Sequence, residues 1–134
     1  MGISDDSTRN LVPGAGGARG LPDDAYVVRG GVSRPESFKV GPHPSGPHGI
    51  SCQSAPGRTV EELAKAGQFP NSRISVTTVG KIRGLCGNVI PTPNLPGFPH
   101  HATITAPHDV WSQSWREQVS QLFDIQPNPF PVRR

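Results

Sequence analysis

Long apolar runs, cysteines and aromatic residues are scarce in this chain of 134 residues. No apolar stretch approaches the roughly 18 to 20 residues of a membrane-spanning helix, which excludes a transmembrane segment and makes a membrane partner unexpected. Cys52 and Cys86 are too few for a disulfide scaffold and lack Cys-x-x-Cys spacing, so we expect two ordinary thiols. The first residues lack the basic and apolar regions of a signal peptide. We therefore expect a cytoplasmic protein, or one delivered into a target cell by a route without a signal peptide.

Metal-ligand spacing and a nucleophile elbow are also missing. His43 and His48 stand in a segment rich in Pro and Gly, and His100 and His101 are adjacent, with no cysteine or carboxylate at a spacing typical of a zinc site. We expect no bound metal. The absence of Gly-x-Ser-x-Gly after a strand argues against a Ser-His-Asp hydrolase.

Proline and glycine are abundant, with 16 of each, so regular elements must be short. The net charge of +3 comes from arginines scattered along the chain rather than gathered in a stripe. A dedicated duplex-binding protein usually concentrates its basic residues. The charge therefore predicts some affinity for anionic ligands and no more.

Local patterns predict a small, loop-rich α+β fold with mainly antiparallel pairing and two short helices. Residues 1–24 carry a glycine cluster without a flanking strand or helix pattern, which predicts a flexible N-terminal arm before a single domain over 25–134. A capping box predicts one helix, and apolar spacing predicts a second of about three turns from Ser112, ended by the prolines that follow. The predicted strands cover 25–30, 49–54, 73–79, 88–90 and 100–106, the first helix covers 59–67, and 80–87 is a short helical turn or a loop.

Polar side chains recur beside apolar ones on three of these strands. Arg29 ends the first, Ser51 and Ser54 lie on the second, and His101 and Thr103 lie on the last. If the strands enclose a cleft, Arg29 can hold a phosphate, Ser51 can contact a ribose or its ring, and His101 can bond ribose hydroxyls. A site that splits a dinucleotide needs these groups. Each residue also has a structural interpretation, as a surface charge, a strand hydroxyl or a hydrogen-bonded core histidine.

Three segments carry a resemblance to a known family. Tyr26-Val27-Val28-Arg29-Gly30 and Gly49-Ile50-Ser51-Cys52-Gln53-Ser54 resemble the first two motifs of bacterial ADP-ribosyltransferase-like toxin domains. The segment from Val89 to Pro107, with His101-Ala102-Thr103-Ile104, is similar to the end of small type VI secretion effectors of that fold. The resemblance implies NAD as a substrate and an antitoxin or immunity protein as partner. It also implies a set of site residues: Arg29, Ser51 and His101 as catalytic, and Tyr26, Arg29, Gly30, Ser54 and Thr103 as NAD-binding.

One departure from the family pattern changes what the resemblance implies. Arginine-modifying transferases carry a catalytic Glu in a Glu-x-Glu or Gln-x-Glu motif, but no acidic residue lies between Glu62 and Asp109. The resemblance thus implies a variant site in which His101 positions the nicotinamide ribose. The expected activity is transfer of ADP-ribose to a macromolecule or hydrolysis of NAD.

Two other functions remain open at this point. A small metal-independent ribonuclease toxin would use His101 as acid or base, His100 or His43 as the second proton-transfer group, and Arg29 or Arg83 for the phosphorane. Nucleic acid is a partner only under this alternative. A non-catalytic module that binds a protein through its Pro-rich loops is the third interpretation.

Overall fold

Six short strands form one antiparallel sheet in the order β5-β6-β3-β2-β4-β7 in the computed structural model, which describes residues 20–38, 49–93 and 96–133. Every neighbouring pair in the sheet is antiparallel. The expected small α+β class is therefore confirmed. The strands are β2 (Tyr26–Gly30), β3 (Ile50–Gln53), β4 (Arg73–Thr78), β5 (Asn88–Pro91), β6 (His101–Thr105) and β7 (Asp124–Pro127).

Three α-helices accompany the sheet in the described residues, one more than the sequence predicts: α1 (Val60–Gly67), α2 (Val79–Gly84) and α3 (Gln113–Ser120). The additional helix is α2, which falls in the segment left open between a helical turn and a loop. The side chain of Thr78 accepts a hydrogen bond from the amide of Lys81, which caps this helix and ends the preceding strand one residue early. Two single 3-10 turns cover Pro35–Ser37 and Pro107–Asp109.

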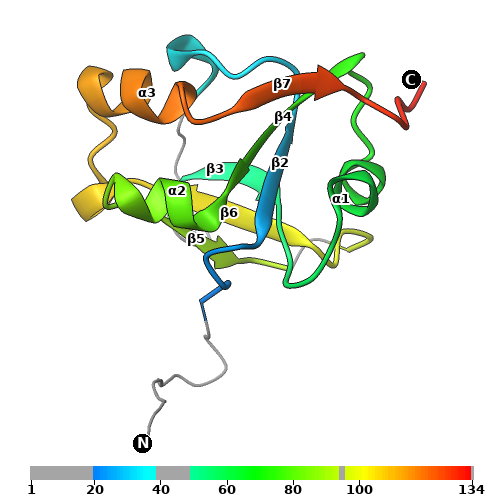
Figure 1. The fold of residues 1–134 in the computed structure, drawn as a ribbon, viewed down its shortest axis with the longest axis horizontal. Coiled ribbons are helices and arrows are strands. Elements are labelled where there is room, and N and C mark those ends of the chain that lie inside the picture. The colour runs from blue at the N-terminus through cyan, green and yellow to red at the C-terminus, as the bar shows by residue number, and fades with distance from the viewer. Residues whose placement is uncertain (1–19, 39–48, 94–95, 134) are drawn as a thin grey trace, which may run out of the picture.

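The helices cover opposite faces of the sheet and create two cores. Figure 1 shows α1 on one side of β2 and β4, with α2 and α3 on the other. Leu63 and Ala64 of α1 pack with Val28 and Ile74 in the smaller core. The larger core joins α2 and α3 to the opposite sheet face and centres on fully buried side chains such as those of Val27, Phe38, Ile82, Ile104 and Val119.

The sheet consists of two halves joined by a single residue pair. β2 and β3 share only the pair Val28–Gln53, whereas β2 and β4 share five pairs and β3 and β6 share four. Figure 1 shows β2 and β4 crossing steeply over β3, β5 and β6. The register of this one pair therefore decides which side chains of the two halves share a face.

The last helix is shorter than predicted, and the chain that follows it forms a strand. α3 ends at Ser120, and Asp124–Pro127 pairs with β4 as β7. Val119 and Phe123 are both buried and are spaced as on one face of a helix, so the apolar pattern in the sequence continues past the end of α3. Pairing with the open edge of β4 overrides that local preference.

The domain begins earlier than the predicted boundary at residue 25. Leu21 is 4% exposed and belongs to the larger core, and the carbonyl of Asp23 accepts the amide of Gly80 at 2.8 Å. Asp23 also pairs with Arg83 at 2.7 Å. Residues 20–24 are therefore part of the packed domain, and the remainder of the predicted arm lies outside the described residues. No helix in the described part of the chain is long and apolar enough to cross a membrane.

Candidate functional site

Arg29 does not converge with Ser51 and His101, contrary to the expectation from the sequence. The pairs Val28–Gln53 and Gln53–His101 place these residues on one face of the sheet. Ser51 pairs with Thr103 on that same face. Arg29 follows Val28 on β2 and so points to the opposite face, which corrects the predicted three-residue site.

Arg29 lies instead against the larger core. Its guanidinium carbon is 4.8 Å from the centroid of the Phe38 ring, and Nη2 donates a long hydrogen bond of 3.5 Å to the carbonyl of Ser37. Burial lowers the pKa of Arg29, while its neighbour Cys52 acts in the opposite direction. Burial also raises the pKa of the Cys52 thiol to about 12. These groups form a packed cluster with a structural role.

Four other predicted residues lie apart from His101 or are already bonded. Ser51 is exposed, and Thr103 is buried with its hydroxyl 2.9 Å from Thr92 Oγ1. A Cβ on Gly30 would meet Asn71 Oδ1 at 2.5 Å, so close packing explains this glycine. Tyr26 is 41% exposed and lines a separate pocket.

His101 is held in place through its Nδ1 atom. Its Nδ1 lies 3.0 Å from the carbonyl oxygen of Thr92 and 2.9 Å from Thr92 Oγ1. A carbonyl oxygen only accepts, so in the neutral tautomer that carries its proton on Nδ1 the ring donates to Thr92, and Nε2 then holds a lone pair. The Thr92 hydroxyl can then donate to Thr103 Oγ1, which completes a short chain of hydrogen bonds. In this tautomer Nε2 is an acceptor.

His101 lines a cavity of about 350 Å³ together with two other groups of functional interest, His100 and Arg58. Ser54, a predicted NAD-binding residue, lines it as well. The volume falls at the lower end of the range for small-molecule sites. The remaining walls are apolar, from Leu21, Ala55, Pro56, Pro91 and Pro99. This arrangement of a few polar groups in an apolar cavity can orient a ligand and exchange protons with it.

Arg58 is the cation of this pocket. It stands immediately before the cap of α1, and its Nη1 lies 3.3 Å from Glu62 Oε2. Both side chains are 47% exposed, so the ion pair is weak and an anionic ligand can compete for the guanidinium. The hydrogen bond from the amide of Thr59 to Glu62 is the main reason that the pKa of this carboxyl is lowered. The carboxylate therefore has a second partner that keeps it in place when Arg58 turns away.

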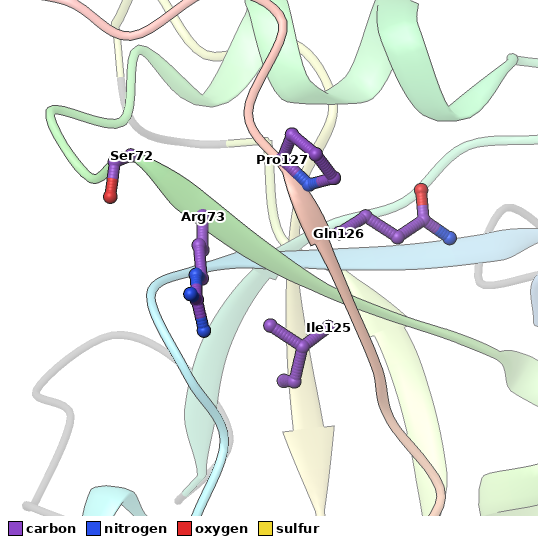
Figure 2. Close-up of a pocket in the computed structure, with 5 residues that line it drawn as sticks. All are labelled: Ser72, Arg73, Ile125, Gln126 and Pro127. Atoms are coloured by element: carbon purple, nitrogen blue, oxygen red, sulfur yellow. The ribbon is translucent and has the colours of Figure 1, made fainter.

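A larger cavity of about 420 Å³ lies at the far end of β4 and β7, lined by Ser72, Arg73, Ile125, Gln126 and Pro127. Figure 2 shows the side chains of Arg73 and Ile125 on one side of the strands and that of Gln126 pointing away from them. Its lining contains no histidine, cysteine or carboxylate, and none of its residues belongs to the predicted site. Acid–base chemistry therefore favours the smaller pocket.

Sequence reasoning missed Arg58, although a signal existed. Arg58 is next to the capping box of Thr59 and Glu62, and the N-terminus of a helix beside a strand end is a common position for anion-binding groups. His100 was considered as a metal ligand, which its spacing argued against, and as a proton-transfer group of the ribonuclease. Within the described ranges no cluster of three or more potential metal-ligating side chains occurs, and Cys52 and Cys86 are free thiols.

The fold and the pocket define a small α+β domain with a histidine-lined cavity on the β3–β6 half of its sheet. No protein-family model, curated protein or solved structure matches the chain.

Proposed function

We propose that this chain is a bacterial toxin domain of the ADP-ribosyltransferase-like type, with NAD as its substrate. The observation that carries the proposal is the position of His101, whose Nδ1 lies 3.0 Å from the Thr92 carbonyl oxygen while the residue lines the 350 Å³ pocket. Nε2 is then the ring nitrogen available to a ligand. A fixed acceptor of this kind suits a ribose hydroxyl, and the resemblance of the 26–30 and 89–107 segments to such toxins supports the same substrate.

The reaction breaks the bond between C1′ of the ribose and the nicotinamide nitrogen. The bonding electron pair leaves with nicotinamide, and positive charge develops on C1′ and the ring oxygen. A hydrogen bond from the ribose 2′-hydroxyl to Nε2 of His101 increases electron density next to that charge and stabilises it. Water or a nucleophile of a macromolecule then adds to C1′ and loses its proton.

Arg58 takes the phosphate-binding role that the sequence suggested for Arg29. A guanidinium binds the pyrophosphate through two parallel hydrogen bonds. Its exposed pairing with Glu62 costs little to break. Ser54 has a supporting role, because its hydroxyl is donated to the Tyr26 carbonyl at 2.6 Å and fixes the wall of the pocket.

The test is release of nicotinamide from NAD by the purified chain, measured by chromatography. His101→Asn preserves a donor to Thr92 and removes the Nε2 acceptor, so release should fall on the order of a hundredfold. His108→Asn is the matched control, since His108 is exposed in a left-handed conformation that Asn tolerates. Absence of release, together with absence of thermal stabilisation by NAD, would sink the proposal.

A ribonuclease is the second candidate, favoured by the presence of His100 and His101 in one pocket with Arg58. Two imidazoles can act as base and acid in phosphodiester cleavage, and the guanidinium can stabilise the phosphorane. Arg29 and Arg83, first considered for that role, do not line the cavity. His100→Asn separates the two functions, because it should abolish RNA cleavage and leave nicotinamide release intact. Inactivity on both substrates favours the non-catalytic binding module.

The toxin proposal includes a partner and a location. An antitoxin or immunity protein would protect the producing cell by covering the pocket of His101. The domain would act in the cytoplasm, either of the cell that makes it or of a target cell that it enters without a signal peptide.

A further inference from the structure

A second, smaller cavity lies on the face of the sheet that α1 covers. It measures about 180 Å³ and is lined mainly by residues of β2, β4 and β7: Tyr26, Val60, Val76, Thr77, Thr78, Lys81, Asp124 and Gln126. The pairs Tyr26–Thr78 and Val76–Asp124 place those side chains on one face. Gln126 pairs with Ile74, a residue of the core under α1, and so belongs to that face too.

The orientation of Gln126 agrees with this register. Figure 2 shows its side chain directed away from Arg73 and Ile125, which flank the cavity on the opposite face. Gln126 borders both cavities, and the register places its side chain on the face that carries Tyr26.

The small cavity adjoins the His101 pocket through one short segment of chain. Ser54 lines the His101 pocket and donates its hydroxyl to the carbonyl of Tyr26, which lines the small cavity. Arg58 lines the first pocket, and Val60, two residues later, lines the second. Two residues span at most about 7 Å of extended chain. Lining residues of the two cavities are therefore close neighbours in space.

The chemistry of the small cavity fits a nucleobase. Tyr26 is an aromatic ring with 41% of its surface exposed, which is a platform for stacking. The Gln126 amide can bond two adjacent polar atoms of adenine, the N6 amine and N7. Lys81 and Asp124 carry opposite charges, so the site favours a neutral ring over an anion. At 180 Å³ the cavity is below the usual size for a whole small-molecule ligand and suits one flat ring system.

We propose that this cavity binds the adenine ring of NAD, with the nicotinamide ribose in the His101 pocket and the pyrophosphate at Arg58 between them. The inference rests on the proposed function and specifies the substrate as an adenine dinucleotide. It gives Tyr26 a stacking role and Gln126 the role of reading the base.

AMP is the probe that tests the inference without catalysis, and calorimetric titration of the full chain is the measurement. Tyr26→Ala should weaken AMP binding by about 5- to 150-fold, the loss expected for one stacked base. Tyr26→Phe keeps the ring and should bind AMP as the original chain does. Ile125→Ala is the matched control on β7, because Ile125 is exposed on the opposite face next to Gln126.

Base recognition gives a second readout. The original chain should bind AMP more tightly than IMP, whose oxygen replaces the N6 amine, and Gln126→Leu should remove that preference. AMP affinity that Tyr26→Ala leaves unchanged, or no AMP binding by the original chain, would overturn the inference. AMP binding that depends on Tyr26 without nicotinamide release would instead remove the proposed reaction and keep the adenine site. Nicotinamide release by Tyr26→Ala with an unchanged KM for NAD would keep the proposed reaction and remove the adenine site.

Discussion

The guanidinium of Arg29 stacks over the ring of Phe38, with its central carbon 4.8 Å from the ring centroid. Phe38 is fully buried, and Arg116 donates to its carbonyl from the other side. The segment that carries Phe38 is thus fixed between two arginines that come from β2 and α3. This explains the buried charge at position 29 by packing and cation–π attraction.

Replacing Arg29 by methionine should leave nicotinamide release within about twofold, because its side chain points to the opposite face of the sheet and does not line the His101 pocket. Stability should also stay within about 1 kcal/mol, since a flexible apolar side chain can replace a buried charge against an aromatic ring. Release assays and urea unfolding measure the two effects. A large loss of nicotinamide release by a variant that still folds would show that Arg29 contributes to the site.

A second prediction concerns the hydroxyl chain from His101 through Thr92 to Thr103. Thr92→Val leaves the Thr103 hydroxyl, which is 4% exposed, without its partner and should cost about 1–3 kcal/mol of unfolding free energy. Thr92→Val with Thr103→Val removes both hydroxyls and should cost less than the sum of the single changes. Urea unfolding of the four proteins in this cycle is the measurement, and simple additivity would contradict the proposed chain. The carbonyl of Thr92 survives in every variant, so its contact with His101 Nδ1 should persist.

Local sequence patterns predict much of the secondary structure. The capping box of Thr59 and Glu62 predicts α1, and both of its hydrogen bonds are present at 2.9 and 3.1 Å. Alternation predicts β4, where Ile74 and Val76 are buried under α1. The end of α1 differs in detail, because Gln68 rather than a glycine takes the left-handed conformation at φ 51°. Gly67 has a different reason, since a Cβ there would meet the Phe69 ring at 2.3 Å.

The site could not be predicted in the same way because it depends on register. Alternation fixes which residues of one strand share a face, but the match between strands is a non-local property, and a slip of one residue inverts it. Sequence reasoning grouped Arg29 with Ser51, whereas the pair Val28–Gln53 puts them on opposite faces. Arg58 lies at the pocket because of the path that the chain takes between β3 and α1, and no local pattern specifies that path.

Acid should weaken α1 through Glu62. Hydrogen bonding, chiefly from the Thr59 amide, lowers the pKa of this carboxyl below its ordinary value of 4.5, so the folded state favours the ionised form. The stabilisation is therefore complete above pH 4.5 and is lost as the pH falls through the lowered folded value. Glu62→Gln should reduce the acid dependence of thermal unfolding between about pH 5 and pH 2 while it keeps a capping acceptor. An unchanged acid limb in this variant would show that other groups dominate it.

Each edge strand of the sheet has a proline at a position whose backbone points away from the neighbouring strand. On β5 the amide of Thr92 bonds to β6. The backbone groups of the alternate residues Val89 and Pro91 therefore point away from β6, toward the open edge. Pro91 has no N–H, and the amide of Val89 donates to Asn88 Oδ1 at 2.9 Å. On β7 the amide of Asn128 bonds to the carbonyl of Ser72, so the backbone groups of Ile125 and Pro127 point away from β4. Pro127 again supplies no N–H donor at that edge.

Pro127→Thr should therefore allow the β7 edge to pair with a strand of a second chain. The change adds an outward N–H two residues from that of Ile125, whose side chain is 40% exposed, and two such donors allow a second chain to pair with the strand. Analytical ultracentrifugation should detect self-association of this variant at a lower concentration than that of the original chain. Pro129→Thr lies beyond the last residue of β7 and should leave the association state unchanged. If Pro127→Thr behaves like that control, the proline has no protective role, and the short length of β7 is sufficient to close the edge.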